Sequence, residues 1–412
     1  MSGPAAAQTP PPIKTPAPRV TIALWHTPRR GEPVSTTVII LFFVGLVLIV
    51  GGSELLVRGA SRLATAAGIS PLVVGLTVVA FGTSSPELAV GIRSALEGTG
   101  AVTVGNVIGA NIINMLLILG LAAVILPLEV PQRLVRLDVP LLIGVGAALA
   151  LLAWDGSFSR LDGALLIAGA VAYIAFCVRA SRQESLAVRE DYEEEFAPPE
   201  QERRGVGYHL RSVLFALLGL GLLFYGSNLL IDSAMAFARA LGVGELLIGL
   251  TVVAIGTAMP EIATTVTASL RGERDIAIGA VIGSVQFNML GVVGLAAAVA
   301  PGGIEVPRAA LVFDMPVMIA VFVACLPIFF IGGRVSRAEG ALFLFYYAAY
   351  TAYLIQSASP SGASKVFHIA MLGFVLPITA LTLLVLSVRW SQRARREPSP
   401  APDRRPPAGS SS

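Results

Sequence analysis

The sequence has few charged residues, few cysteines and few histidines, and each shortage excludes a class of protein. Charged residues make up 13% of the 412 residues, whereas hydrophobic residues make up 55%. A soluble domain needs more charge to cover its surface, so lipid must be the solvent for most of this chain. The two cysteines, Cys177 and Cys325, indicate no disulfide framework, and the three histidines lack the spacing of a metal site.

Two other absences exclude a β-barrel and several kinds of enzyme. Strand-like alternation of polar and apolar residues is absent, whereas a transmembrane barrel requires it. No HExxH-like zinc motif, nucleophile constellation or phosphate-cradling glycine loop accompanies the acidic residues described below. We therefore expect that the protein is not an enzyme and that it needs no cofactor.

Apolar stretches of roughly 20 residues, the length of a membrane-spanning helix, dominate the chain. They predict an all-α integral membrane protein with eleven candidate spans, near 36–57, 70–96, 101–127, 137–154, 160–180, 209–231, 244–270, 275–300, 309–332, 337–356 and 366–390. Residues 1–35 are rich in Pro, Ala and Thr, and residues 391–412 are rich in Arg and Pro. Both are predicted to be disordered tails.

The distribution of Lys and Arg predicts how the chain crosses the membrane, because cytoplasmic loops carry an excess of both. Residues 181–208 form the one long polar stretch between the spans. With this loop in the cytoplasm, 20 Lys and Arg lie inside and 9 lie outside. We therefore expect a multi-pass protein of the plasma or inner membrane, with the 181–208 loop and the C-terminus in the cytoplasm and the N-terminus outside.

The two halves of the chain are repeats. Residues 71–98 align with residues 245–272 at a constant offset of 174, and 14 of the 28 positions are identical. Five spans separate corresponding helices, and an odd number reverses the direction of crossing. The sequence therefore predicts two inverted five-helix repeats, 36–180 and 209–356, which is a recurring architecture of secondary transporters. The span at 366–390 has no counterpart and is predicted to be an extra helix outside this ten-helix core.

Each half carries one interrupted span with a glutamate at the break. The two motifs are Gly82-Thr83-Ser84-Ser85-Pro86-Glu87 and Gly256-Thr257-Ala258-Met259-Pro260-Glu261. Proline removes a backbone donor, so the carbonyls near Ala80–Thr83 and Ala254–Thr257 are expected to lose their helical partners. In lipid, such carbonyls must face protein, water or an ion.

Glu87 and Glu261 are predicted to form one cation site near the bilayer midplane. Intramembrane acids usually mark an ion pathway, and no Lys or Arg lies at this depth to pair with these two. Two carboxylates held close together repel each other unless a cation or a proton binds. A single such motif could be only a helix kink, but its occurrence in both halves favours a site for a divalent cation with about 6–8 oxygen ligands. Further oxygens would come from the freed carbonyls and from Thr83, Thr257, Asn114 and Asn288.

Asp138 and Asp314 also occupy corresponding places in the two halves, each two residues before a proline. An aspartate before a helix-starting proline at a membrane edge is usually a helix cap. We therefore expect two caps, and a role at an ion vestibule is the alternative.

At these residues the sequence resembles the sodium/calcium exchanger family of the cation/calcium antiporters. The resemblance rests on the two GT(S/A)xPE motifs and on the glycine- and Asn-containing helices that follow them, and it covers roughly 36–356. It implies two inverted five-helix repeats, alternating access, and competition of sodium and calcium for one central cluster. By the family pattern, Glu87 and Glu261 are the central calcium ligands. The flanking oxygens come from Thr83, Ser84, Thr257 and Ser284, with carbonyls from Ala80 and Ala254.

This sequence departs from the family pattern at three positions. Ala258 and Ala110 stand where the family often has serine, and Asn288 stands where some members have Asp. Inverted symmetry assigns the two alanines to one flanking site, and Ser84 and Ser284 to the other. The number of sodium ions per cycle therefore stays open, and protons carried by the two glutamates are an alternative to sodium.

The predicted function is a secondary active antiporter that exchanges Ca²⁺ for Na⁺, with a Ca²⁺/H⁺ exchanger of the same fold as the alternative. A cation channel is less favoured, because paired broken helices in inverted halves are typical of carriers. A membrane-embedded enzyme is a further alternative. The expected partners are the transported ions and the lipid bilayer, with no nucleic acid and no obligate protein partner.

Overall fold

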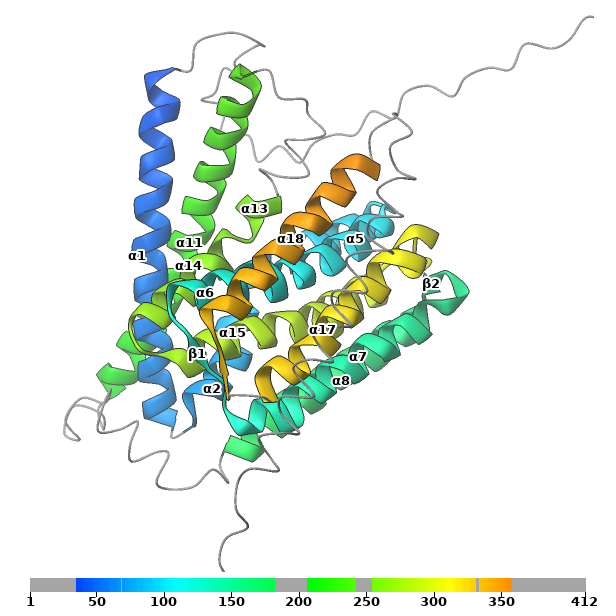
Figure 1. Cartoon of the computed structure of the whole chain (residues 1–412), viewed down its shortest axis with the longest axis horizontal. Helices are drawn as coiled ribbons and strands as arrows, with labels where there is room; N and C mark the ends of the chain where they lie inside the picture. Colours follow the sequence, from blue (N-terminus) through cyan, green and yellow to red (C-terminus); the bar gives the residue numbers. More distant parts are fainter. Residues whose placement is uncertain (1–34, 68, 182–205, 242–253, 331–332, 358–412) are drawn as a thin grey trace, which may run out of the picture.

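The computed structural model describes residues 35–67, 69–181, 206–241, 254–330 and 333–357 (Figure 1). These residues are mostly helical, as the composition predicts. Residues 1–34 of the predicted N-terminal tail, the whole predicted C-terminal tail, most of the 181–208 loop and the predicted span at 366–390 lie outside them.

The described residues contain seven helices that are long and apolar enough to cross a membrane. An eighth span is counted if Pro71–Thr83 and Ser85–Leu96, which are bent by 49° at their junction, form one crossing. The prediction of a multi-pass membrane protein is thereby confirmed. The predicted total of eleven spans stays a prediction, because parts of 244–270 and all of 366–390 lie outside the described part of the chain.

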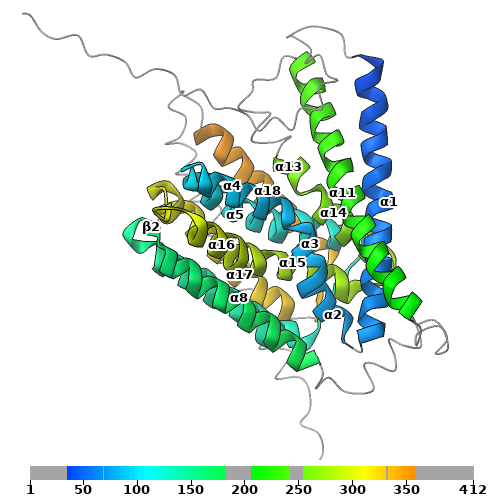
Figure 2. The ribbon, with the colours of Figure 1, turned by 180° about the vertical axis from the view of Figure 1, so that it is seen from behind.

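The two longest helices, α1 (Thr36–Ala67) and α11 (Val206–Ala240), lie side by side at one edge of the molecule (Figures 1 and 2). Glycines let the two backbones approach each other. A Cβ atom on Gly52 would lie 2.8 Å from the Gly219 carbonyl oxygen, and one on Gly219 would lie 2.7 Å from the Gly52 carbonyl oxygen. Close packing over small residues is how helices associate in lipid, where the hydrophobic effect does not drive them together.

Two spans with a π-helical turn in the middle form the centre of the molecule. The first consists of α5 (Gly100–Ile112), η2 (Ile113–Ile118) and α6 (Leu119–Ile125). The second consists of α15 (Arg274–Phe287), η6 (Asn288–Val292) and α16 (Val293–Val299). The second is almost completely buried, so the core of the protein surrounds it.

Four helices complete the side of the molecule opposite the long pair: α7 (Val139–Leu152), α8 (Arg160–Ser181), α17 (Met315–Phe330) and α18 (Arg337–Ser357). The shorter elements are α2 (Pro71–Val74), η1 (Gly75–Val79), η3 (Leu134–Asp138), η4 (Ala153–Asp155) and η7 (Ala310–Asp314). The helices η3 and η7 continue directly into α7 and α17.

Both predicted helix breaks are present. The first separates α3 (Ala80–Thr83) from α4 (Ser85–Leu96), and the second separates α13 (Ala254–Thr257) from α14 (Met259–Leu270). The end of the first helix of each pair and both bounds of the second differ by the sequence offset of 174. The proline of each motif therefore interrupts the helix at the same place in each half.

Two short antiparallel strand pairs join the halves of the chain. The strand β1 (Leu128–Glu129) pairs with β4 (Arg334–Val335), and β2 (Ser157–Phe158) pairs with β3 (Ile304–Glu305). Each pair takes one strand from each half, so the halves are interlocked at two places.

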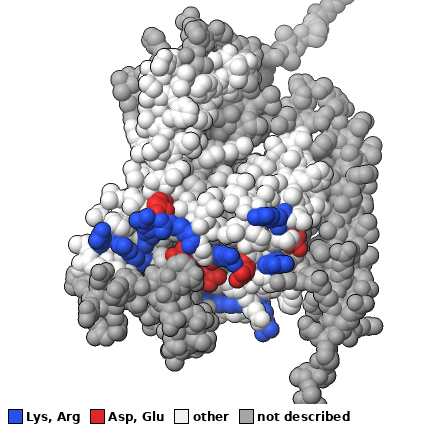
Figure 3. Space-filling model, turned by 60° about the vertical axis from the view of Figure 1, so that its left-hand side comes forward, with Lys and Arg blue, Asp and Glu red and all other residues white. Residues whose placement is uncertain are grey.

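Charged side chains gather in a band on the face shown in Figure 3, below a wide surface without charge. Glu54 pairs with Arg58 at 2.6 Å and also with Arg271, and Arg274 pairs with Glu129. These three arginines and two glutamates thus neutralise one another in part, and the uncharged surface suits contact with lipid.

Candidate ion-binding site

The two glutamates lie in the first turns of α4 and α14, directly after the helix breaks. At both breaks the linking residue, Ser84 or Ala258, has a backbone φ of −83°. Proline occupies the second position of each half-helix and glutamate the third. A carboxylate at the start of a helix is favoured by the helix dipole, so each half-helix supports a negative charge at this place.

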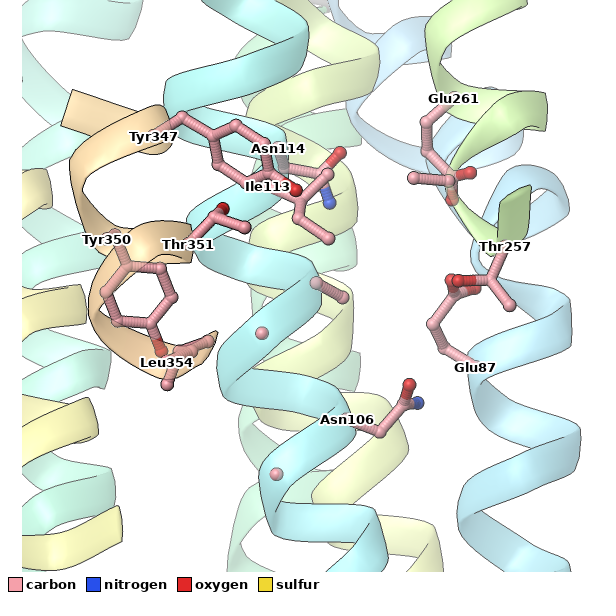
Figure 4. A pocket seen from close by; sticks show the side chains of 14 residues that line it. Glu87, Asn106, Ile113, Asn114, Thr257, Glu261, Tyr347, Tyr350, Thr351 and Leu354 are labelled. Atoms are coloured by element: carbon pink, nitrogen blue, oxygen red, sulfur yellow. The ribbon is translucent and has the colours of Figure 1, made fainter. Parts of the chain in front are cut away.

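Glu87 and Glu261 point toward each other from the two broken helices (Figure 4). Each is only 5% exposed. Within the described residues, no Lys, Arg or His forms an ion pair with either of them, and one oxygen of each carboxylate is buried without a hydrogen-bond partner. Thr83 and Ser84 lie beside the Glu261 carboxylate.

The two glutamates line a cavity of about 220 Å³. One face of α5 forms its floor, and α18 bounds it on the side away from the glutamates (Figure 4). The lining extends from the glutamates toward the Gly100 end of α5 and the Ser357 end of α18. The lining residues are Glu87, Gly105, Asn106, Gly109, Ala110, Ile113, Asn114, Thr257, Ala258, Glu261, Tyr347, Tyr350, Thr351 and Leu354.

The predicted site residues divide into a cavity set and a sealed set. The cavity set consists of Glu87, Glu261, Thr257 and Asn114, which line the cavity. The sealed set consists of Thr83, Ser84, Ser284 and Asn288, which are at most 1% exposed and are not part of the cavity wall.

In the sealed set, residues of the first motif contact α15 of the other half. The Thr83 hydroxyl lies 3.4 Å from the Ser284 hydroxyl. The Asn288 amide donates a hydrogen bond of 3.1 Å to Asn111, and its own carbonyl oxygen has no partner among the described residues. The Ser84 hydroxyl is also buried without a partner there. This set therefore contains buried oxygens that a small cation could coordinate.

The prediction that the Ala80 carbonyl loses its helical partner is wrong. The helix continues through the Gly-Thr step, and the Ser84 N–H donates to the Ala80 oxygen at 3.0 Å. The carbonyl that the proline frees is that of Gly82, four residues before Pro86, and the Ser85 hydroxyl donates to it at 2.7 Å.

The second half satisfies its freed carbonyl in a different way. Methionine takes the place of Ser85 there, and the Ser227 hydroxyl of α11 donates to the Gly256 oxygen at 2.7 Å. Ala254, the residue corresponding to Ala80, is the first described residue of α13.

The aspartates predicted to be helix caps are not caps. The helix passes through Asp138 with φ −71° and ψ −41°, and no side-chain cap bond forms. The Asp138 carboxylate instead accepts a bond of 3.2 Å from the Tyr173 hydroxyl, and Asp314 accepts one of 3.1 Å from Tyr350. The π-helical turns η3 and η7 carry the chain through both positions, so neither proline starts a helix.

Several polar residues of the cavity wall were not identified from the sequence. Asn106 lies on α5 eight residues before Asn114, and this spacing places both on one helix face. That spacing is a signal that could have identified Asn106. The hydroxyl groups of Tyr347, Tyr350 and Thr351 on α18 follow no comparable pattern.

The described residues contain no group of three or more His, Cys, Asp or Glu that could hold a metal ion. A cation between the two glutamates would therefore take its other ligands from neutral oxygens. Thr257, Asn106 and Asn114 supply such oxygens on the cavity wall, and the Asn114 carbonyl oxygen has no partner among the described residues. Oxygen ligands of this kind suit calcium and sodium better than zinc or copper.

Comparison with known proteins gives a consistent result. The family model described as sodium/calcium exchanger protein matches residues 37–179 and 211–356. CaxA of Alkalimonas amylolytica is 37% identical over 325 residues, which cover 77% of this chain and 98% of CaxA. The sodium/calcium exchanger MaX1 of Methanosarcina acetivorans is 28% identical over 344 residues, covering 76% of this chain and 97% of MaX1.

A solved structure shares the fold. The sodium-calcium exchanger NCX_Mj, soaked with zero Na⁺ and Ca²⁺, superposes on this chain with a TM-score of 0.65 at 26% identity. The superposition covers 77% of this chain and 98% of that chain.

Proposed function

The chain belongs to the sodium/calcium exchanger family, and we propose that it exchanges Ca²⁺ for Na⁺ at the site formed by Glu87 and Glu261. As a member of this family it is a transporter and not an enzyme. The observation that carries the proposal is the pair of buried carboxylates, which point toward each other on the wall of a cavity without a cationic partner among the described residues.

Electrostatics favours a divalent cation at this position. A pair of unit charges about 4 Å apart gains about 4 kcal/mol at the effective dielectric constant of a protein near its surface. A calcium ion between the glutamates forms two such pairs, each with twice the charge on the cation. A single sodium ion at the same position would be attracted less strongly, because it carries half the charge. Several sodium ions could therefore replace one calcium ion, and the site would hold either calcium or sodium but not both at once.

We also propose that the two halves are inverted repeats, and reciprocal contacts support this arrangement. A Cβ atom on Gly163 of α8 would lie 2.7 Å from the Gly294 oxygen of α16, and one on Gly340 of α18 would lie 2.7 Å from the Gly120 oxygen of α6. Each half thus contributes its last helix to the same surface of the other half. The two strand pairs are reciprocal in the same way.

The unequal environments of the cavity set and the sealed set support alternating access. The cavity extends toward the Gly100 end of α5, on the side that the Lys and Arg distribution predicts to be outside. In this conformation an external ion would reach Thr257 and Asn114, whereas Thr83 and Ser284 are closed off. In the opposite conformation the sealed set would open to the cytoplasm, Thr257 and Asn114 would close, and the two glutamates would be reached from the cytoplasmic side.

The buried neutral oxygens favour sodium over protons as the coupling ion. Protons need only the two glutamates, whereas the sealed set adds buried oxygens of Ser84 and Asn288 that have no hydrogen-bond partner among the described residues. On the cavity wall, Ala110 and Ala258 stand where the family often has serine, and the missing hydroxyl groups favour the Ca²⁺/H⁺ alternative or a smaller number of sodium ions per calcium ion.

The test is calcium uptake into proteoliposomes loaded with sodium, compared with choline-loaded vesicles and with vesicles under a pH gradient. Uptake that requires internal sodium, and that Glu87→Gln and Glu261→Gln each abolish, is the expected result. Glu97→Gln is the matched control, because Glu97 follows the same helix α4 but is exposed and paired with Arg93 at 2.8 Å. Uptake driven by protons alone would establish the alternative, and no calcium flux under any gradient would reject calcium as the substrate.

A further inference from the structure

Tyr350 connects the ion cavity to a second carboxylate. Its side chain lines the cavity from α18, on the side away from the glutamates (Figure 4), and it is 7% exposed. Its hydroxyl group donates a hydrogen bond of 3.1 Å to Asp314, which is the last residue of η7. Asp314 thus lies directly behind the cavity wall.

The corresponding pair in the other half has a different environment. Asp138 accepts a hydrogen bond from Tyr173, is 1% exposed, and has the Arg133 guanidinium at 4.0 Å. Arg133 precedes Asp138 by five residues, and the residue five places before Asp314 is Ala309. Within the described residues no Lys or Arg forms an ion pair with Asp314. The first carboxylate therefore has a cationic neighbour inside the protein, whereas the second lies next to the cavity without one among the described residues.

The hydrogen bond determines what Tyr350 can offer to an ion. A tyrosine hydroxyl has a single proton to donate and otherwise accepts. Because Asp314 takes this proton, the Tyr350 oxygen has only lone pairs left for anything inside the cavity. A carboxylate acceptor also increases the electron density on that oxygen. Tyr347 and Thr351 add two more hydroxyl groups to the same part of the wall.

We propose that Asp314 and Tyr350 form an outer cation station, at which a partly hydrated Ca²⁺ ion from outside binds before it reaches Glu87 and Glu261. The Tyr350 oxygen is the ligand, and Asp314 supplies the negative charge that attracts the ion. Na⁺ binds there more weakly because it carries half the charge. The inference rests on the proposed function, since it assigns an entry step to the same cavity.

The station affects transport from one side only. In this conformation the cavity extends from the glutamates toward the Ser357 end of α18, so ions that enter from this side pass Tyr350. Ions that enter from the other side reach the glutamates through the sealed set. Removing the charge should therefore raise the external calcium concentration for half-maximal rate and leave the maximal rate and the internal ion dependence unchanged.

The experiment compares Asp314→Asn with Asp138→Asn in right-side-out and inside-out membrane vesicles. Asparagine keeps a carbonyl acceptor for the tyrosine and removes only the charge. We expect Asp314→Asn to raise the half-saturating external calcium concentration about three- to tenfold, and Tyr350→Phe to raise it about two- to threefold. The effect of Asp314→Asn should shrink as ionic strength increases, because salt screens a partly exposed charge. Asp138→Asn should leave the half-saturating calcium concentration unchanged at both membrane faces.

A second variant covers the case in which Asp314→Asn does not fold. Ala309 is exposed, and Ala309→Arg gives Asp314 the arginine that Asp138 already has, so it should reproduce the loss of external calcium affinity. An unchanged half-saturating concentration in both variants, an equal shift from both membrane faces, or the same shift in Asp138→Asn would overturn the proposal. Failure of the underlying function is distinguishable, because calcium uptake by the unmodified protein would then be absent or would survive Glu87→Gln.

Discussion

Replacing Gly283 by alanine should destabilise the protein, whereas the same replacement at Gly109 should not. The two glycines occupy corresponding positions on α15 and α5, at the offset of 174. A Cβ atom on Gly283 would lie 2.4 Å from the Leu76 oxygen and 2.6 Å from the Leu76 Cα. A Cβ atom on Gly109 would meet no atom of the described residues within 4 Å.

The size of the effect follows from these distances. Both contacts at Gly283 are with backbone atoms of η1, so relief requires the helix and not only a side chain to move by about 1 Å. Overpacking of this kind costs about 1–3 kcal/mol. A change of 1 kcal/mol shifts the Tm of domains of about 150–250 residues by about 2–4 °C, so a fall of at least a few degrees is expected.

The assay is thermal unfolding of the purified protein in detergent, followed by size-exclusion chromatography of the heated samples. Gly283→Ala should elute as aggregate at a temperature several degrees below the unmodified protein, and Gly109→Ala should match the unmodified protein. Gly109→Ala should still slow calcium uptake, because α5 would become the packed helix when the cavity closes. Equal unfolding temperatures for the two variants would refute the argument from backbone contact.

Three further outcomes are expected. Ser227→Ala removes the donor to the Gly256 oxygen and should lower stability by about 1 kcal/mol in the same thermal assay. It should also weaken calcium affinity, as measured by the calcium dependence of uptake. An unchanged affinity would mean that this hydrogen bond does not shape the site. Asn288→Asp adds a carboxylate to the sealed set and should lower the sodium concentration for half-maximal calcium efflux, and no change would exclude Asn288 from the sodium pathway. Arg271→Gln removes one partner of Glu54 on a partly exposed surface and should change stability by less than about 1 kcal/mol, which a Tm within about 2 °C of the unmodified protein would establish.

The helix breaks could be predicted from sequence because their cause is local. Proline at position 86 or 260 removes one donor and affects the turn before it wherever the chain folds. The group that replaces the lost donor could not be predicted in the same way. Ser85 is a neighbour in sequence, but Ser227 comes from a different helix, and only the packing of α11 against α13 brings it to Gly256.

The aspartates illustrate a second limit. Asp138 and Asp314 precede prolines, and local rules favour a cap at both places. Tertiary contacts override these rules, because a tyrosine hydroxyl from the last helix of each half donates a hydrogen bond to the aspartate. The cavity-lining role of Tyr350 likewise depends on how α18 packs beside α5, which no motif within α18 encodes.

The reciprocal strand pairs impose an order on biogenesis. Leu128 pairs with Val335, and Phe158 pairs with Ile304, so both strands of the first half wait for partners that are synthesised much later. The β2–β3 pair can therefore close only after Glu305 is synthesised, and the β1–β4 pair only after Val335. Until then the strands of the first half stay without their partners, and unpaired strand edges are templates for pairing with other chains.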